Sequence, residues 1–179
     1  MRIPIAALFA ACVAAVALPG CVAQPPLPRA ADVDLDRFMG DWYVIASIPT
    51  WLERDAYNAV ESYARLPDGR IQTTFRYRAG GFGGAAKAMH PVGTVRAGTG
   101  RAEWGMQFVW PVKAQYVIAW LDPGYREVIV ARSKRDYVWI MARTPALDDA
   151  RYAALVRRVA AMGYDVSRLR RVPQRWPAQ

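Results

Sequence analysis

The chain has 179 residues, with 24 basic and 15 acidic side chains and only two cysteines. This length suits one domain, and the apolar fraction of 54% excludes an intrinsically disordered protein. Considered by itself, a formal charge of +9 favours a nucleic-acid-binding protein. The N-terminal segment argues against that class of protein.

The first 21 residues form an export signal. Arg2 is followed by an uncharged run over residues 3–18 and by the tetrapeptide Leu-Pro-Gly-Cys, which ends at Cys21. A positive start, a long apolar run and small residues at its end are typical of a secretory signal peptide. The tetrapeptide resembles the lipobox of bacterial lipoproteins. That resemblance implies a signal peptide over residues 1–20 and lipidation of Cys21, and an uncleaved N-terminal helix is the alternative.

Cleavage before Cys21 changes the composition of the mature chain. It leaves 159 residues with a formal charge of +8, and it removes Cys12. Because acyl chains occupy Cys21, no thiol remains for a disulfide, a metal site or a nucleophile. In lipoproteins of this kind, Val22 in place of aspartate implies sorting to the outer membrane, and we expect the domain on its periplasmic face. Prolines make residues 21–33 an extended tether that separates the domain from its lipid anchor.

Short segments of alternating apolar and polar residues follow the tether. The eight predicted strands cover residues 42–48, 57–66, 70–78, 87–96, 101–110, 115–121, 126–132 and 136–142. Turn residues such as Pro67, Asp68 and Gly69 separate them, because proline fixes φ and glycine accepts a positive φ. Short, regularly spaced strands predict an all-β barrel or sandwich.

One amphipathic helix is predicted after the strands. Asp148 or Asp149 can cap it, and Gly163 ends it. Its apolar stripe consists of Tyr152, Leu155, Val156, Val159 and Met162. We expect this stripe to pack on the outside of the barrel, and a helix on the membrane surface is the alternative. The arginines of the helix and tail predict a basic surface that faces either the membrane or solvent.

Three short motifs in order identify a family resemblance. Gly40 and Trp42 match the G-x-W signature of lipocalins, Asp136 and Tyr137 match the core of their T-D-Y signature, and Arg143 matches the arginine after the last strand. The resemblance covers residues 34–172 and is greatest to the bacterial lipocalins, which are outer-membrane lipoproteins. It implies an eight-stranded up-and-down antiparallel barrel over residues 34–173, with one C-terminal helix packed outside and a tail at 174–179.

The same resemblance assigns structural roles to two of these residues. Trp42 is expected to plug the closed end of the barrel, and Arg143 is expected to lie across its indole and bond backbone carbonyls. Neither residue is then expected to contact a ligand.

An eight-stranded barrel is wide enough to enclose one small ligand. Alternation puts Trp104, Met106 and Phe108 on one face of a strand, together with Trp110. The lipocalin resemblance points a further set of side chains into the cavity: Val117, Ala119, Leu121, Tyr137, Trp139 and Met141. Such a lining suits an acyl chain, because methionine adapts to a flexible ligand and indole or phenol groups bond a polar head. A solid core is the alternative.

The resemblance also turns the face that contains Glu61 and Tyr63 inward. A carboxylate in an apolar cavity is costly without a partner. Either Glu61 lies near the wet mouth with an arginine, or a bulge turns it outward. If it faces the ligand, it favours a zwitterionic or amine-bearing head over a fatty carboxylate. In the loop 49–56, Trp51 and Leu52 are either lid residues or part of a partner surface.

Little in the sequence favours catalysis. His90 is the only histidine, too few for a typical metal cluster, and no serine lies in a nucleophile motif. We therefore expect no catalytic residue, metal or cofactor. The predicted function is binding, storage or transport of a fatty acid, lysophospholipid or related membrane lipid by a protein that acyl chains hold on the membrane. A homodimer is possible, and nucleic acid is not expected. The alternatives are an envelope interaction module that uses the helix or the lid, and a lipid-modifying enzyme.

Overall fold

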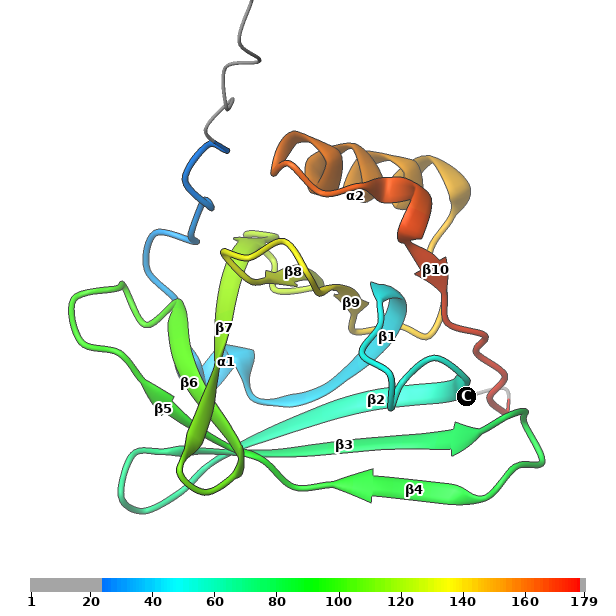
Figure 1. Ribbon diagram of the computed structural model, residues 1–179, viewed down its shortest axis with the longest axis horizontal. Helices are drawn as coiled ribbons and strands as arrows, with labels where there is room; N and C mark the ends of the chain where they lie inside the picture. The colour runs from blue at the N-terminus through cyan, green and yellow to red at the C-terminus, as the bar shows by residue number, and fades with distance from the viewer. Residues whose placement is uncertain (1–23, 178–179) are drawn as a thin grey trace, which may run out of the picture.

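The computed structural model describes residues 24–177, so the signal peptide, Cys12 and Cys21 lie outside the described residues. The strands are β1 (Gly40–Ile48), β2 (Ala56–Arg65), β3 (Ile71–Ala79), β4 (Ala86–Met89), β5 (Val92–Val95), β6 (Glu103–Val109), β7 (Val112–Leu121), β8 (Glu127–Ala131), β9 (Val138–Ala142) and β10 (Arg170–Arg171). All pairings are antiparallel, and β9 pairs with β1 to close the sheet into a barrel (Figure 1).

The barrel has the predicted eight strand positions. Strands β4 and β5 share one position, since both pair with β3, and the predicted single strand 87–96 is therefore interrupted. The interruption falls at His90 and Pro91. Proline has no N–H for the ladder, and its carbonyl instead accepts a bond from the Thr73 N–H at 2.9 Å.

The loops divide the barrel into two ends. The open end carries the loops β1–β2 (49–55), β3–β4 (80–85), β6–β7 (110–111) and β8–β9 (132–137). The closed end carries the remaining hairpin turns and the short helix α1 (Leu35–Phe38), whose N-cap is Asp34. Gly40, the first residue of β1, has φ of +88°, a left-handed conformation that favours glycine.

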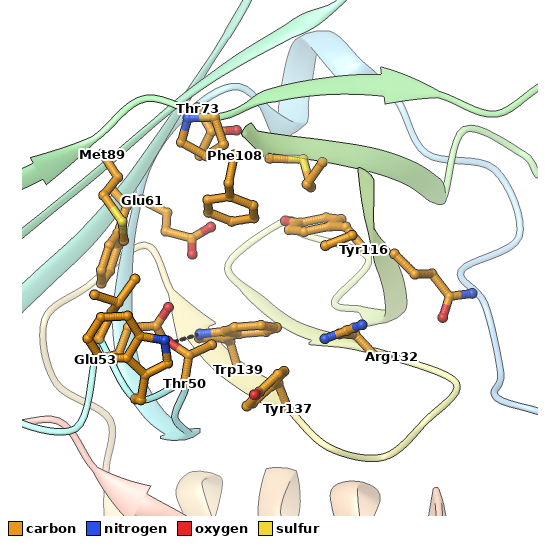
Figure 2. A pocket seen from close by; sticks show the side chains of 17 residues that line it. Thr50, Glu53, Glu61, Thr73, Met89, Phe108, Tyr116, Arg132, Tyr137 and Trp139 are labelled. Atoms are coloured by element: carbon orange, nitrogen blue, oxygen red, sulfur yellow. Dashed lines mark hydrogen bonds between the residues drawn. The ribbon is translucent and has the colours of Figure 1, made fainter. Parts of the chain in front are cut away.

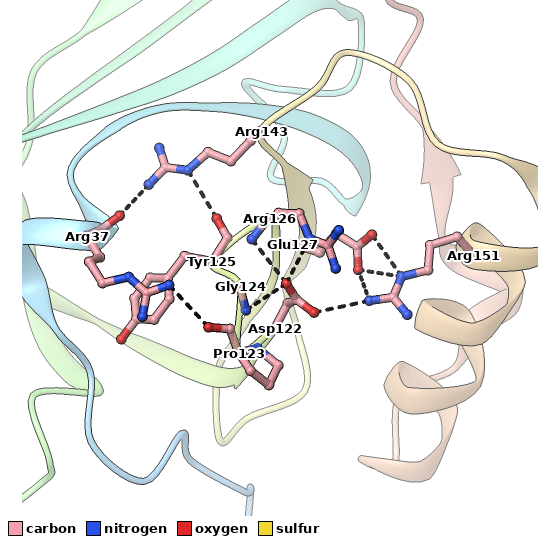
Figure 3. Close-up of polar contacts among 9 residues, drawn as sticks. All are labelled: Arg37, Asp122, Pro123, Gly124, Tyr125, Arg126, Glu127, Arg143 and Arg151. Carbon is pink, nitrogen blue, oxygen red and sulfur yellow. Dashed lines mark hydrogen bonds and ion pairs between the residues drawn. The ribbon is translucent and has the colours of Figure 1, made fainter.

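The closed end is filled by Trp42, as predicted. Its side chain is completely buried, and its Nε1 donates to the carbonyl oxygen of Phe38 at 2.8 Å. The Arg143 guanidinium lies 3.8 Å from the indole centroid. It donates to several backbone carbonyls, including those of Asp41 at 2.8 Å and Met39 at 2.9 Å, and Figure 3 shows its bonds to Arg37 and Tyr125. This end is thus closed by an aromatic plug and a fully bonded cation.

Helix α2 (Asp149–Ala161) packs on the outside of the barrel, as predicted. Asp148 caps it, because its carboxylate accepts a bond from the Arg151 N–H at 2.7 Å. Leu155 and Val159 are buried in a cluster that includes the outward side chains of β1, β8 and β9. Because that apolar stripe is covered by the barrel, it is not available to insert into a membrane surface.

Much of the basic surface on the helix and tail has partners within the protein. Arg151 forms a two-pronged ion pair with Glu127 (Figure 3). Arg158 stacks 4.5 Å from the centroid of Trp120. A separate short 3-10 helix, η1 (Val166–Arg168), follows α2 and leads to β10.

Both terminal segments lie along the barrel wall. The described part of the tether is held at Pro25, whose carbonyl accepts a bond from Arg135 at 2.6 Å, and at Ala30, whose N–H donates to Ile118 at 2.9 Å. In the C-terminal segment, strand β10 pairs with β1. The chain then continues to Arg175, whose N–H donates to Asn58. Among residues 24–177, no helix is both long and apolar enough to cross a membrane.

Candidate functional site

A cavity of ≈ 260 Å³ opens at the open end of the barrel. Its wall is mostly apolar, and Figure 2 shows side chains from opposite walls converging on it. The lining residues are Thr50, Trp51, Leu52, Glu53, Glu61, Thr73, Phe75, Met89, Pro91, Met106, Phe108, Ala114, Gln115, Tyr116, Arg132, Tyr137 and Trp139.

Five of the predicted ligand residues line this cavity. Met106 and Phe108 come from β6, Glu61 comes from β2, and Tyr137 and Trp139 come from the end of the β8–β9 loop and from β9. Met106 is buried, whereas Phe108 is 56% exposed at the mouth. The alternation of β6 therefore continues from the core into the rim of the cavity.

Four predicted residues join the core inside the barrel but do not line the cavity: Trp104, Tyr63, Met141 and Leu121. Trp104 stacks on Tyr116 with ring centroids 4.8 Å apart, and its Nε1 donates to the carbonyl of Arg101 at 2.8 Å. The solid core and the cavity thus both exist, one above the other in the same barrel.

The predicted inward orientation of Val117 and Ala119 is wrong. Ala119 is buried in the outer cluster beneath α2, and Val117 lies beneath the tether in a groove with Pro25. The cause is a bulge in β7 between Ile118 and Trp120, where the register with β8 shifts by one residue. Because of the bulge, the residues two and four positions before the inward Leu121 point outward. Tyr116 and Ile118 point into the interior instead.

The β1–β2 loop covers part of the mouth. Trp51 is 73% exposed and Leu52 is 41% exposed, and both line the cavity. Three bonds attach the loop to the rest of the barrel. Tyr77 donates to the Leu52 carbonyl at 3.2 Å, Trp139 Nε1 donates to Glu53 Oε2 at 3.0 Å, and the Gly80 N–H donates to the Asp55 carbonyl at 2.8 Å. Trp51 and Leu52 therefore lie at the mouth of the cavity with much of their side chains exposed, a position that suits either a lid or a partner surface.

Glu61 faces the cavity, and its partner is a tyrosine rather than an arginine. The Tyr63 hydroxyl donates to Glu61 Oε2, and Tyr116 donates to the Tyr63 hydroxyl at 2.8 Å. Burial raises the pKa of Glu61 to about 7, against the opposing effect of the Tyr63 bond, and the nearby charge of Glu53 raises it further. Near neutral pH this carboxyl is therefore divided between its charged and neutral forms.

Glu53 is the second acid of the cavity. Burial raises its pKa, and the bond from Trp139 partly offsets that effect. Figure 2 shows Glu53 and Glu61 on the same side of the cavity.

Arg132 lies across the cavity from these acids (Figure 2). It forms an ion pair with Asp136 at 3.1 Å, and its guanidinium lies 5.3 Å from the centroid of Tyr137. Its Nε is buried and has no hydrogen-bond partner in the described part of the chain. A buried donor without a partner is costly. Arg132 is the one basic residue among the described residues that line the cavity, so its guanidinium is the group that can face an anionic or carbonyl group of a ligand.

Sequence reasoning missed several lining residues. Thr73 and Phe75 share the inward face of the third predicted strand, so the alternation that was already visible could have selected them. Arg132 and Tyr116 had no such signal. The first lies where a strand meets a polar turn, and the second is on the face that the bulge disguises.

The described residues hold no cluster of three metal-ligating side chains. His90 is exposed, and its Nδ1 lies 3.3 Å from the Thr74 hydroxyl. These positions are consistent with a surface role for the histidine.

Comparison with known proteins agrees with this geometry. The Lipocalin-like domain family matches residues 33–174. The outer membrane lipoprotein Blc of Escherichia coli K12 is 29% identical over 165 residues, which cover 90% of this chain and 92% of Blc. Temperature-induced lipocalin-1 of Arabidopsis thaliana is 28% identical over 154 residues, which cover 79% of this chain and 80% of the relative.

Solved structures show the same fold at lower identity. Insecticyanin from the tobacco hornworm Manduca sexta superposes with a TM-score of 0.65 at 15% identity and covers 83% of this chain and 84% of its own. With the plug, the cavity and the three motifs in place, the chain belongs to the lipocalin family, whose members bind small lipophilic ligands, and is a bacterial lipocalin similar to the Blc lipoproteins.

Proposed function

We propose that this lipocalin reversibly binds a lipid with a single acyl chain, such as a fatty acid or a lysophospholipid. The observation that carries the proposal is the apolar cavity of ≈ 260 Å³ with polar groups at a few points of its wall. Its size lies near the lower limit of small-molecule sites, which favours one chain over two. Burial of the chain supplies the affinity, at about 25 cal/mol per Å² of apolar surface.

The polar groups favour a head with charges of both signs. Glu53 and Glu61 suit an amine, and the guanidinium of Arg132 suits a phosphate or a carbonyl. A fatty carboxylate meets repulsion from ionised Glu61, which a zwitterionic head avoids. A zwitterionic lysophospholipid therefore fits the cavity better than a bare fatty acid.

The proposed place of action is the outer membrane. The lipobox-like sequence before Cys21 and the similarity to outer membrane lipoproteins support an anchored protein on the periplasmic face. Storage and transport of membrane lipids then need no enzymatic step, and binding is the activity that we propose.

Filling the cavity tests the site. Ala114 lies on the cavity wall, whereas Ala88 is exposed on β4. Ala114→Phe is expected to weaken the binding of oleoyl lysophosphatidylethanolamine about tenfold or more, measured by calorimetry, because the added ring occupies ligand space. Ala88→Phe is the control and should bind as the wild type does. Equal affinity in the two variants contradicts the cavity as the site.

The head-group preference has its own test in pH. Oleate should bind more tightly at pH 6 than at pH 8, because Glu61, with a pKa of about 7, becomes neutral as the pH falls. Glu61→Gln should bind oleate equally at both values apart from the effect of Glu53. If the wild type and Glu61→Gln show the same pH profile, Glu61 does not face the bound head.

A further inference from the structure

The large apolar side chains that the described residues expose are gathered at the open end. Seven such residues are exposed, and only Trp176 lies elsewhere, packed against Tyr43 on the outer wall. The other six form what we call the apolar rim: Trp51, Leu52, Phe108, Val109, Trp110 and Val112. Isolated exposed apolar residues are ordinary, but a gathered set marks an interaction surface.

The rim borders the mouth of the cavity. Trp51, Leu52 and Phe108 line the cavity itself, and the β6–β7 hairpin carries Val109 and Trp110 beyond it. Trp110 is 81% exposed, the highest value among these residues. A tryptophan at the tip of a hairpin suits the boundary between lipid headgroups and acyl chains, where its ring and its N–H both find partners.

The tether reaches the barrel at this same end. Arg135, in the β8–β9 loop, holds the Pro25 carbonyl, and from there the chain runs down the wall to Val33, which bonds Gly100 in a closed-end loop at 2.9 Å. Arg135 is itself fixed, since its Nε donates to the Met162 carbonyl at 2.9 Å. Cys21 is four residues before Pro25, a reach of at most about 14 Å. An acyl anchor on Cys21 is therefore confined to the neighbourhood of the open end.

We propose that the open end docks on the bilayer, with the apolar rim immersed in the headgroup region and the cavity opening onto the lipid. This rests on the proposed lipid binding and on the anchor at Cys21. Exposed Arg54, Lys113 and Lys134 lie in or beside the open-end loops and favour anionic headgroups. Ligand then passes between the bilayer and the barrel without crossing water.

Site-directed spin labelling of the full lipidated chain tests the orientation. In the mature chain the lipidated Cys21 takes up no label, so one introduced cysteine is labelled alone. Val112→Cys places the label on the rim, and Ala97→Cys places it in an exposed closed-end loop as the matched control. The protein is reconstituted in vesicles of phosphatidylethanolamine and phosphatidylglycerol. The ratio of collisions with oxygen to collisions with a nickel chelate should be several-fold higher at position 112 than at position 97.

Equal, water-like ratios at the two positions overturn the docking. Strong coupling between labels at position 112 also overturns it, because a second copy of the chain then covers the rim. If the chain without an introduced cysteine takes up label, the anchor itself is absent, and flotation of Cys21→Ser with the same vesicles then decides whether the rim alone binds them. These results do not depend on whether a ligand binds in the cavity.

A second variant separates docking from ligand binding. Trp110 does not line the cavity, so Trp110→Ser should keep the solution affinity for oleoyl lysophosphatidylethanolamine. Its transfer of that lipid to the vesicles should slow about tenfold, since a tryptophan contributes a large part of the rim area. Trp176→Ser is the control and should transfer at the wild-type rate. An unchanged transfer rate in Trp110→Ser overturns the proposal.

Discussion

Arginine has opposite surroundings at the two ends of the barrel. At the closed end, Arg143 lies over the Trp42 ring at 3.8 Å and donates to several backbone carbonyls. At the open end, Arg132 has one ion pair, one distant aromatic ring and a buried Nε without a described partner. The acids differ in the same way, since Glu61 lies in a cavity that raises its pKa to about 7.

This difference separates stability from function. Buried polar groups cost little when all their bonds are made, and they are expensive when bonds are missing. The closed end makes its bonds internally and needs no ligand. The open end leaves two carboxyl groups and a guanidinium on the wall of a cavity, where a ligand can pair with them.

The largest expected effect tests the closed end. Trp42→Ala should lower the free energy of unfolding by about 4 kcal/mol, because it empties a fully buried aromatic site. Urea unfolding measures it. Trp51→Ala is the control, as that side chain is 73% exposed, and it should cost under about 0.5 kcal/mol. Equal losses in the two variants contradict the plug.

One substitution made at both ends gives the sharpest comparison. Arg143→Met should cost about 3 kcal/mol, since it leaves several carbonyls without their donor. Arg132→Met should cost under about 1 kcal/mol, because one partly exposed ion pair is lost. Urea unfolding of both, under one buffer, checks the order. A reversed order means that the open end is structural.

The smallest expected effect is a gain in stability. Glu61 has a pKa of about 7 in the folded protein and a model value of 4.5. The folded state therefore loses stability through this group as the pH rises from about 4.5 to 7. Glu61→Gln should be about 2 kcal/mol more stable than the wild type at pH 8, less than the full shift because the side chain keeps some solvent contact.

The same pair of proteins should unfold with nearly equal free energies at pH 4, where both side chains are neutral. Urea unfolding at the two pH values provides the measurement. An advantage for Glu61→Gln that is the same at pH 4 and pH 8 assigns the effect to packing and removes Glu61 from the titrating groups of the cavity.

Local sequence patterns were sufficient for most of the fold. Alternation located the strands, and the spacing of Leu155 and Val159 located both the helix and its buried face. The break between β4 and β5 was also within reach, because Pro91 cannot continue a ladder. The contact between Trp42 and Arg143 was predicted only from the family resemblance. The local sequence around Gly40 and Trp42 does not indicate a contact with a residue about a hundred positions away.

The site was harder to predict because strand register decides which side chains face the cavity, and a shift of one residue reverses them. A single bulge in β7 reverses the expected orientation of Val117 and Ala119, and no glycine or other sequence signal in that strand predicts the bulge. Two alternative arrangements of Glu61 are predicted from the sequence, and the structure shows a third, in which Glu61 faces inward with a tyrosine partner. Arg132 and Glu53 belong to loops, and only the closure of the barrel brings them to one cavity.

The seam between β1 and β2 has a consequence for the order of folding. These strands pair only from Gly40 to Tyr43, and beyond that point the C-terminal segment fills the gap. Gln174 donates to Val44 at 2.9 Å and to Ala59 at 3.1 Å, and the Asn58 N–H donates to Pro173 at 2.9 Å. Because a chain is synthesised from its N-terminus, this junction can be completed only after residues 173–174 have been made. The barrel is therefore fastened late, by contacts of very long sequence separation, which form slowly.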